Sequence, residues 1–360
     1  MSWSSGLGHC RSVLGKAALA AAFGWSAGCV SGPAAGPDVA VELRAEDLTV
    51  TPATGPLVHV RVRNPGGRPW AGTVEAAFPA TWQMNRTSHT IKIGPGETAR
   101  LAFAIERGTD AEDNAYPVAL KAVSEDGTEA TRTQTIRVAS APFYKPVIDG
   151  DTADWADSIP VAFVTGGKRT EVRTYWNRAA FCVLAAVEED AHRALDAPAA
   201  GGPDAVQIAL APRTAVTPDQ PSQTDRRYEF LLAATAAGPR CYLLMRPDMT
   251  VAAAAEARPL EGHEWPDAQL AVTRKDGVTY YECALPLEAM PLIRAEPGRE
   301  FYFSVLVHDD GTGLRDRGED ADLWAVQRKP FAWCRWQGAR WPAEPPFDSK
   351  VEWGFCSSKK

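Results

Sequence analysis

Short runs of alternating apolar and polar side chains dominate this chain, and proline and glycine separate the runs. In residues 57–63 (LVHVRVR) every second residue is a valine, and in residues 301–308 (FYFSVLVH) Phe301, Phe303, Val305 and Val307 occupy alternate positions. A period of two places one set of side chains on one face of a β-strand. The 28 prolines and 29 glycines predict many short strands joined by turns. We therefore expect an all-β fold made of two antiparallel β-sandwich domains.

The length of the chain indicates two domains. At 360 residues it is too long for one ordinary hydrophobic core. About eight strand-like runs separated by turn signals such as NPGG (64–67) lie in residues 38–140. A proline-bounded joint, APFYKP, then opens a second unit. We predict domains at residues 38–140 and 141–356, preceded by a leader (1–28) and a tether (29–37).

The leader has the features of an export signal. Arg11 and Lys16 precede an apolar stretch (17–25) that is too short to cross a bilayer as a helix. Small residues directly before Cys29 resemble the lipobox of bacterial lipoproteins, although the third position before the cysteine is Ser26 where leucine is usual. That resemblance implies a lipid on Cys29 and a membrane-anchored protein of the cell envelope. The alternative is an ordinary signal peptide and a secreted or periplasmic protein; both require export.

The charge of the chain argues against a nucleic-acid partner. The formal net charge is −7, and lysine and arginine are scattered, whereas phosphate binding depends on clustered basic residues. Many acidic residues are present, but no pattern selects two carboxylates that would face each other across a hydrolytic cleft. We therefore predict that the protein is not an enzyme. His192, His263 and His308 share no metal-ligand spacing, so we expect each to be a lone surface or core histidine.

The first predicted domain resembles a known spacer domain. The order NPGGRPWAGTVEAAFPATW, then GPGETARLAFAI, then a Y-P-V-A-L strand is similar to the immunoglobulin-like domain beside catalytic domains in bacterial α-galactosidases and other secreted glycosidases. The resemblance covers the whole of residues 38–140. It implies an immunoglobulin-like sandwich with a spacer role and supplies no binding residues.

The second predicted domain resembles the family 9 carbohydrate-binding module. The matching series is DGD-x-x-DW, a Trp-Asn turn before a strand, D-A-V-Q-I-A-L, Y-E-C-A-L-P-L, P-G-R-E-F-Y-F-S-V-L-V and a D-D-G loop. The series spans essentially the whole domain. It implies a sandwich that binds a polysaccharide or oligosaccharide without catalysis.

Departures from that family fall at the residues that would contact sugar. Members stack a tryptophan on the sugar ring just before the D-x-V-x-I strand, where this chain has Gly201, and an acidic ligand on the strand becomes Gln207. The polar positions of the next strand are Leu231 and Ala233. The remaining ligand candidates lie in the tryptophan-rich run FAWCRWQGARW. Our predicted sugar-binding set consists of Gln207, Trp333, Arg335, Trp336 and Trp341.

Aspartates at the start of the second domain have two interpretations. Asp149, Asp151 and Asp154 could hold a structural calcium ion, which members of the resembled family often bind. Their spacing differs from the EF-hand loop, and aspartate beside Gly150 also makes turns without any ion. Calcium is the one cofactor that we predict, with turn chemistry as the alternative.

Three functions follow from these patterns. The first is a non-catalytic, glycan-associated lipoprotein whose N-terminal domain lifts the binding module from the membrane. The second is a structural or protein-interaction lipoprotein that has lost sugar binding; a closed sheet face around Gln207 and Leu231 would favour it. The third is an accessory part of a glycoside hydrolase system.

Overall fold

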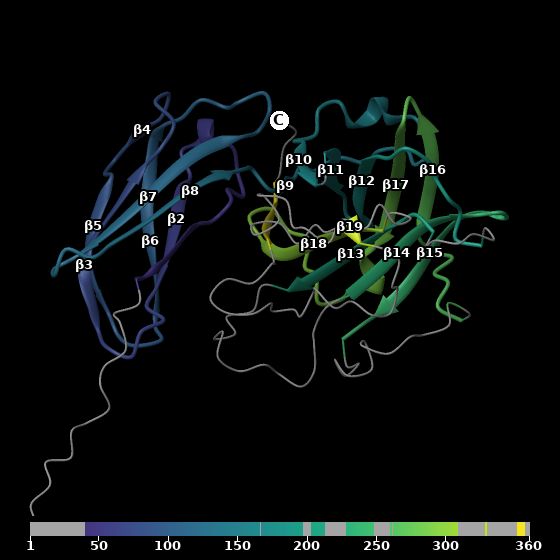
Figure 1. The fold of residues 1–360 in the computed structure, drawn as a ribbon. Helices are drawn as coiled ribbons and strands as arrows, with labels where there is room; N and C mark the ends of the chain where they lie inside the picture. The colour runs from purple at the N-terminus through teal and green to yellow at the C-terminus, as the bar shows by residue number, and fades with distance from the viewer. Residues whose placement is uncertain are drawn as a thin grey trace, which may run out of the picture. The chain divides into compact units, whose positions relative to one another are not determined.

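The computed structural model describes residues 40–165, 167–196, 203–212, 228–247, 260, 262–308, 328–329 and 351–356. Within these ranges the secondary structure consists of β-strands and three short 3₁₀ turns, so the all-β prediction is confirmed (Figure 1). No helix in the described ranges has the length and apolarity needed to cross a membrane.

The first sandwich contains two four-stranded antiparallel sheets. One has the order β1 (Glu42–Ala45), β2 (Leu57–Arg63), β6 (Thr98–Arg107), β4 (Gln83–Met84). The other has the order β5 (Ser88–Ile93), β3 (Trp70–Ala77), β7 (Tyr116–Ser124), β8 (Glu129–Ile136). Inward-facing side chains of both sheets, such as Val60 of β2 and Val74 of β3, pack into one core. The predicted alternation of residues 57–63 is confirmed, because its three valines are buried.

One predicted strand of this sandwich is not formed. The run DLTVTP (47–52) makes a single bridge from Leu48 to Val138 and then enters a 3₁₀ turn, Pro52–Thr54. Proline has no N–H to donate to a ladder, and its fixed φ suits the first position of a helical turn. The turn therefore replaces the expected strand.

The second sandwich pairs a five-stranded sheet with a seven-stranded sheet. The five-stranded sheet has the order β10 (Val161–Thr165), β11 (Lys168–Trp176), β12 (Ala180–Glu188), β17 (Val278–Pro286), β16 (Gln269–Lys275). The seven-stranded sheet has the order β15 (Gly238–Met245), β14 (Tyr228–Thr235), β13 (Ala205–Pro212), β18 (Glu300–His308), β20 (Val351–Phe355), β9 (Ser140–Ala141), with β19 (Arg328–Lys329) beside β18. Two 3₁₀ turns accompany these sheets, η2 (Thr152–Trp155) and η3 (Leu287–Ala289).

Alternation again selects the core between these two sheets. The alternate residues Val206, Ile208 and Leu210 of β13 are buried against the five-stranded sheet together with Phe301 and Phe303 of β18. The opposite face of the seven-stranded sheet is buried as well, with Ala209 among its covered side chains. Alternation alone predicts one buried face, so the second covered face was not expected.

Among the described strands, two pairs are parallel within sheets whose other pairs are antiparallel. β20 pairs in parallel with β9, and β18 pairs in parallel with β19. The indole Nε1 of Trp176 donates to the Cys356 carbonyl at 2.8 Å, and the Cys356 N–H donates to the Ala141 carbonyl at 2.9 Å. Both parallel pairs join segments that are distant in sequence, and no short-range pattern specifies their direction.

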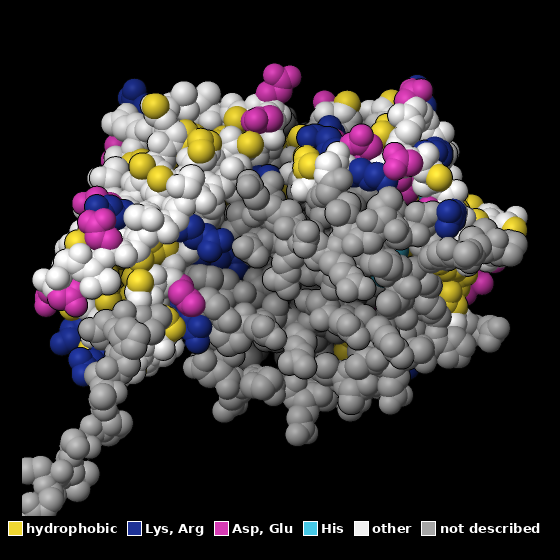
Figure 2. All heavy atoms as spheres, viewed as in Figure 1, with side chains coloured by type: hydrophobic (Ala, Val, Ile, Leu, Met, Phe, Trp, Pro, Cys, Tyr) yellow, Lys and Arg dark blue, Asp and Glu magenta, His cyan; other side chains and the backbone are white. Residues whose placement is uncertain are grey.

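The described part of the surface carries both signs of charge. In Figure 2, Lys and Arg side chains lie interspersed with Asp and Glu side chains on the face towards the viewer. The boundary between the domains at residue 140 and the immunoglobulin-like character of the first sandwich stay predictions.

Candidate functional site

Most of the predicted sugar-binding set lies outside the described residues. Trp333, Arg335, Trp336 and Trp341 belong to this group, and so do Cys29 and Gly201. Their roles stay predictions. Gln207 and the three aspartates are placed by the structure.

Gln207 forms the centre of a buried polar row across three neighbouring strands. It lies on β13, and its side-chain Nε2 donates to Glu229 Oε2 of β14 at 3.0 Å. Its Oε1 lies 2.9 Å from His308 Nε2 of β18. The residue is only 2% exposed. Both ends of the amide are therefore engaged within the protein, and a sugar hydroxyl would have to displace one of these partners.

Apolar side chains flank this row in the strand register. Gln207 lies opposite Leu231 on β14 and opposite Leu306 on β18, and both leucines are buried. Ala233 is also buried and lies opposite Ala205. The sheet face around Gln207 and Leu231 is thus closed to solvent, the condition that the sequence associated with loss of sugar binding.

The three aspartates accept backbone hydrogen bonds in a turn. Asp149 Oδ1 accepts from the Asp151 N–H at 2.9 Å, and Asp151 Oδ1 accepts from the Ala153 N–H at 3.1 Å, which caps η2. Asp154 Oδ2 accepts from the Val147 N–H at 2.8 Å. These contacts are those expected of turn chemistry. The calcium site stays a prediction.

A buried glutamate of β17 secures this turn. Glu282 Oε2 accepts from the backbone N–H groups of Asp149 (3.1 Å) and Gly150 (2.8 Å), and its Oε1 accepts from Trp155 Nε1 at 2.7 Å. The Trp155 ring stacks on Tyr175 with 5.1 Å between centroids. Burial raises the pKa of Glu282, and the N–H donors oppose that shift. The conspicuous D-G-D-x-x-D-W motif is thus a structural corner in this protein.

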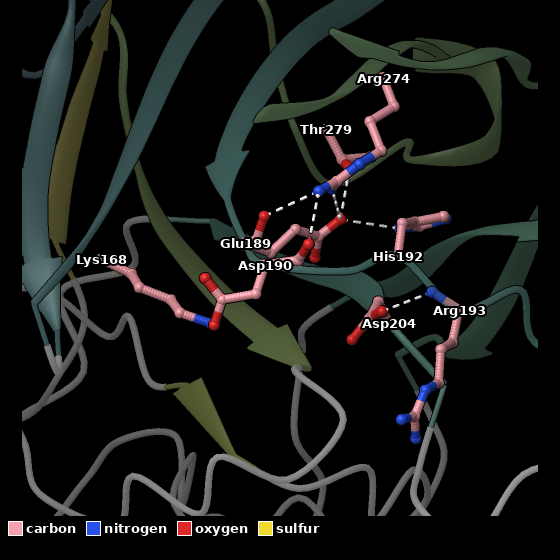
Figure 3. Close-up of polar contacts among 8 residues, drawn as sticks. All are labelled: Lys168, Glu189, Asp190, His192, Arg193, Asp204, Arg274 and Thr279. Carbon is pink, nitrogen blue, oxygen red and sulfur yellow. Dashed lines mark hydrogen bonds and ion pairs between the residues drawn. The ribbon is translucent and has the colours of Figure 1, made fainter. Parts of the chain in front are cut away.

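A second polar group, which the sequence did not predict, follows the end of β12. Figure 3 shows Glu189, His192 and Asp204 converging, and we call these three residues the Glu189 cluster. One ligand-type atom from each residue lies within 4.8 Å of the other two. Glu189 and Asp204 are buried, and His192 is partly buried.

Strand register brings the support for Glu189 from far along the chain. Pairing of β12 with β17 places Glu188 opposite Val278, and the Glu189 N–H donates to the Gly277 carbonyl at 3.0 Å. As a result, Glu189 Oε1 accepts from Thr279 Oγ1 and, at 3.1 Å, from Arg274 Nη1. The neighbours of this acid are therefore set by the β16–β17 hairpin.

His192 and Asp204 are held by the loop between β12 and β13. His192 Nδ1 lies 2.9 Å from Glu189 Oε1. Asp204 Oδ2 accepts from the Arg193 N–H at 2.6 Å, and the Asp204 N–H donates to the Arg193 carbonyl at 3.0 Å. This double contact fixes Asp204 beside the loop that carries His192. The local sequence signal was Glu-x-x-His, which is too common to distinguish a site from a surface turn.

Neither a protein-family model nor a curated protein matches the sequence. Similar solved structures include a family 9 carbohydrate-binding module from Caldicellulosiruptor kristjanssonii in complex with cellotriose, which is 14% identical, covers 57% of this chain and 99% of that chain, and has a TM-score of 0.33. The same type of module in complex with glucose is 14% identical, covers 48% and 78%, and has a TM-score of 0.32. The E. coli chaperone DraB is 12% identical, covers 59% and 93%, and has a TM-score of 0.22. At these TM-scores the description of the fold rests on the strand pairing given above.

Proposed function

We propose that this protein is an exported, non-catalytic carbohydrate-binding lipoprotein. The observation that supports the proposal is the place of the matched motifs in the second sandwich. All of D-A-V-Q-I-A-L except Asp204 belongs to β13 in the interior of the seven-stranded sheet. All of Y-E-C-A-L-P-L except Leu287 belongs to β17, and the F-Y-F-S-V-L-V run forms most of β18. The series quoted for the resemblance therefore supplies central strands of both sheets.

The sugar would bind at the tryptophan-rich segment rather than at Gln207. Gln207 is buried, and its amide contacts Glu229 and His308, so a ligand would have to displace one of these partners. Residues 333–341 contain three tryptophans and Arg335. An indole ring matches the apolar face of a pyranose, and a guanidinium donates to its hydroxyls.

Titration of the purified mature chain with soluble polysaccharides and oligosaccharides tests this proposal. Tryptophan fluorescence would be followed with and without calcium, for the wild type and for Trp333→Ala, Trp336→Ala and Trp341→Ala. We expect saturable quenching by one class of glycan and at least a tenfold loss of affinity in one of the three variants. A calcium requirement would support the predicted ion.

Trp70→Phe in the first sandwich is the matched control. It changes the emission of the protein at a distance in sequence from residues 333–341, so we expect it to keep the affinity of the wild type. A folded protein that responds to no glycan would overturn the proposal.

A structural or protein-interaction role is the second candidate. The closed face around Gln207 and Leu231 favours it, because a buried row whose side chains contact one another is not accessible to a sugar. Absence of glycan binding in the same titration would put this candidate first.

The anchor in the proposal is Cys29. Metabolic labelling with a fatty-acid analogue should mark the wild type and leave Cys29→Ser unlabelled. Equal labelling of the two proteins would remove the lipid from the proposal and leave export to be tested by fractionation.

A further inference from the structure

The Glu189 cluster has an open carboxylate oxygen at its centre. Glu189 Oε1 is occupied by Thr279, Arg274 and His192. Its other oxygen, Oε2, is buried and has no hydrogen-bond partner among the described residues, and the side chain is only 1% exposed. In Figure 3 this second oxygen points away from Arg274, on the side where Asp204 lies. A buried carboxylate oxygen without a partner carries a desolvation penalty that a ligand can remove.

His192 supplies the nitrogen of the cluster. Its Nδ1 lies 2.9 Å from Glu189 Oε1, so Nδ1 is the ring nitrogen that faces the carboxylates. A metal ion bound at Nδ1 would take the place of this hydrogen bond, and a histidine ring nitrogen is a common metal ligand.

The net charge of the cluster and Arg274 is negative, which favours a bound cation. Glu189 and Asp204 contribute two carboxylates, and Arg274 contributes one positive charge at 3.1 Å from Glu189 Oε1. Lys168 contacts Asp190 at 3.0 Å. The two carboxylates and the one guanidinium sum to one net negative charge. Arg274 and Thr279 hold one oxygen of Glu189 in place, as groups behind a ligating carboxylate do.

We propose that Glu189, His192 and Asp204 bind one divalent transition-metal ion, with Zn²⁺ as the representative. Each residue supplies one ligand, and the three ligand atoms are already within 4.8 Å of one another. One imidazole with two carboxylates suits Zn²⁺ and its neighbours, whereas Ca²⁺ takes oxygen ligands almost exclusively. The ion connects the loop after β12 to the first residues of β13.

Isothermal titration of chelator-treated full-length protein with Zn²⁺ tests the site. We expect one equivalent to bind to the wild type, Ca²⁺ to bind at least a hundredfold more weakly, and His192→Gln to lower the Zn²⁺ affinity at least tenfold. His263→Gln is the matched control, because it removes a histidine outside the cluster and should leave the affinity unchanged. Failure of the wild type to bind Zn²⁺, or equal affinity in the wild type and His192→Gln, would overturn the proposal.

X-ray absorption of the Zn²⁺-loaded wild type provides a measurement that does not depend on a folded variant. The site predicts one imidazole, oxygen ligands and no sulfur. A zinc–sulfur distance near 2.3 Å would assign the metal to cysteine and refute the proposed ligands.

Discussion

Glu46 and Glu189 are both buried glutamates that directly follow a strand, and each accepts hydrogen bonds from an arginine. At Glu46 both oxygens are paired: Arg61 Nε lies 2.5 Å from Oε1 and Arg100 Nη2 lies 2.6 Å from Oε2. At Glu189 one oxygen takes all the contacts and the other takes none among the described residues. Burial of an acid therefore does not distinguish a structural role from a binding role, whereas the pairing of its two oxygens does.

The two acids also differ in how their charge is balanced. Burial raises the pKa of Glu46, but hydrogen bonds and charge from Arg100 and Arg61 outweigh it and leave the pKa at about 2. Two guanidiniums thus keep Glu46 ionised until the pH falls to about 2. Glu189 contacts one guanidinium, that of Arg274, and its remaining need for positive charge is what a bound cation would meet.

Glu46→Gln should give the largest loss of stability. The substitution leaves two arginines without their shared buried carboxylate, so we expect about 3 kcal/mol less free energy of unfolding. Urea denaturation at pH 7, followed by far-UV circular dichroism, measures it. Glu42→Gln is the control: Glu42 is 35% exposed and pairs with Arg63 at 3.4 Å, so its loss should stay below about 0.5 kcal/mol. Equal losses in Glu46→Gln and Glu42→Gln would contradict the special role assigned to the buried carboxylate.

Acid should reveal the same ion pair through its pH dependence. Because the folded pKa of Glu46 is depressed from 4.5 to about 2, its stabilisation is present above the unfolded pKa and disappears as the pH falls towards 2. We expect about 2 kcal/mol of pH-dependent stability from this group, allowing for solvent around the two arginines. Denaturation midpoints between pH 5 and pH 2 should fall less steeply in Glu46→Gln than in the wild type. Parallel curves would show that Glu46 is not the group titrating.

Trp155→Phe extends the comparison to Glu282, whose oxygens are paired with N–H groups. The substitution removes the donor to Glu282 Oε1 and keeps an aromatic ring against Tyr175, so we expect a loss of about 1.5 kcal/mol. Trp82→Phe is the matched control, since Trp82 Nε1 donates to the neutral Thr109 carbonyl at 3.2 Å. Its loss should be about half as large in the same urea assay. A larger loss for Trp82→Phe would contradict the claim that a hydrogen bond to the Glu282 carboxylate stabilises the protein more than one to a backbone carbonyl.

Glu189→Gln in metal-free protein should have the smallest effect. A glutamine carbonyl can still accept from Thr279 and His192, so we expect a loss of about 1 kcal/mol in urea denaturation. A loss as large as that of Glu46→Gln would make Glu189 a structural anchor. Such a result would remove the contrast between the two acids.

The strands of both sandwiches were largely predictable because local alternation determines them. Phe301, Phe303, Val305 and Val307 alternate in the sequence, and all four are buried in the core. The closed outer face at Gln207 could not be predicted, because cover over a second face depends on contacts between distant segments. A polar residue at an outward position is normally solvated, so nothing local indicated that this one would pair with Glu229 and His308.

The Glu189 cluster was missed for a related reason. Glu189 and His192 are close in sequence, but Arg274 and Thr279 join them only through the pairing of β12 with β17. The sequence prediction considered the spacing between His192 and the other histidines, and it did not consider the acidic residues near His192. The D-G-D-x-x-D-W motif shows the reverse case. Its aspartates were predicted to hold calcium, and in the structure they accept hydrogen bonds from backbone N–H groups.

The parallel pairing of β9 with β20 has a consequence for how the protein folds during its synthesis on the ribosome. β20 lies between β18 and β9, so residues 300–303 of β18 have no neighbour on that side until residue 351 and those after it have been made. The β20–β9 part of the sheet therefore joins a strand made late in synthesis to one that is made before the other strands of this sandwich. Contacts of such long sequence separation form slowly, and the waiting edge of β18 can pair with another chain in the meantime. The yield of native protein should thus depend on how quickly β20 pairs with β18 and β9 once residues 351–355 have been made.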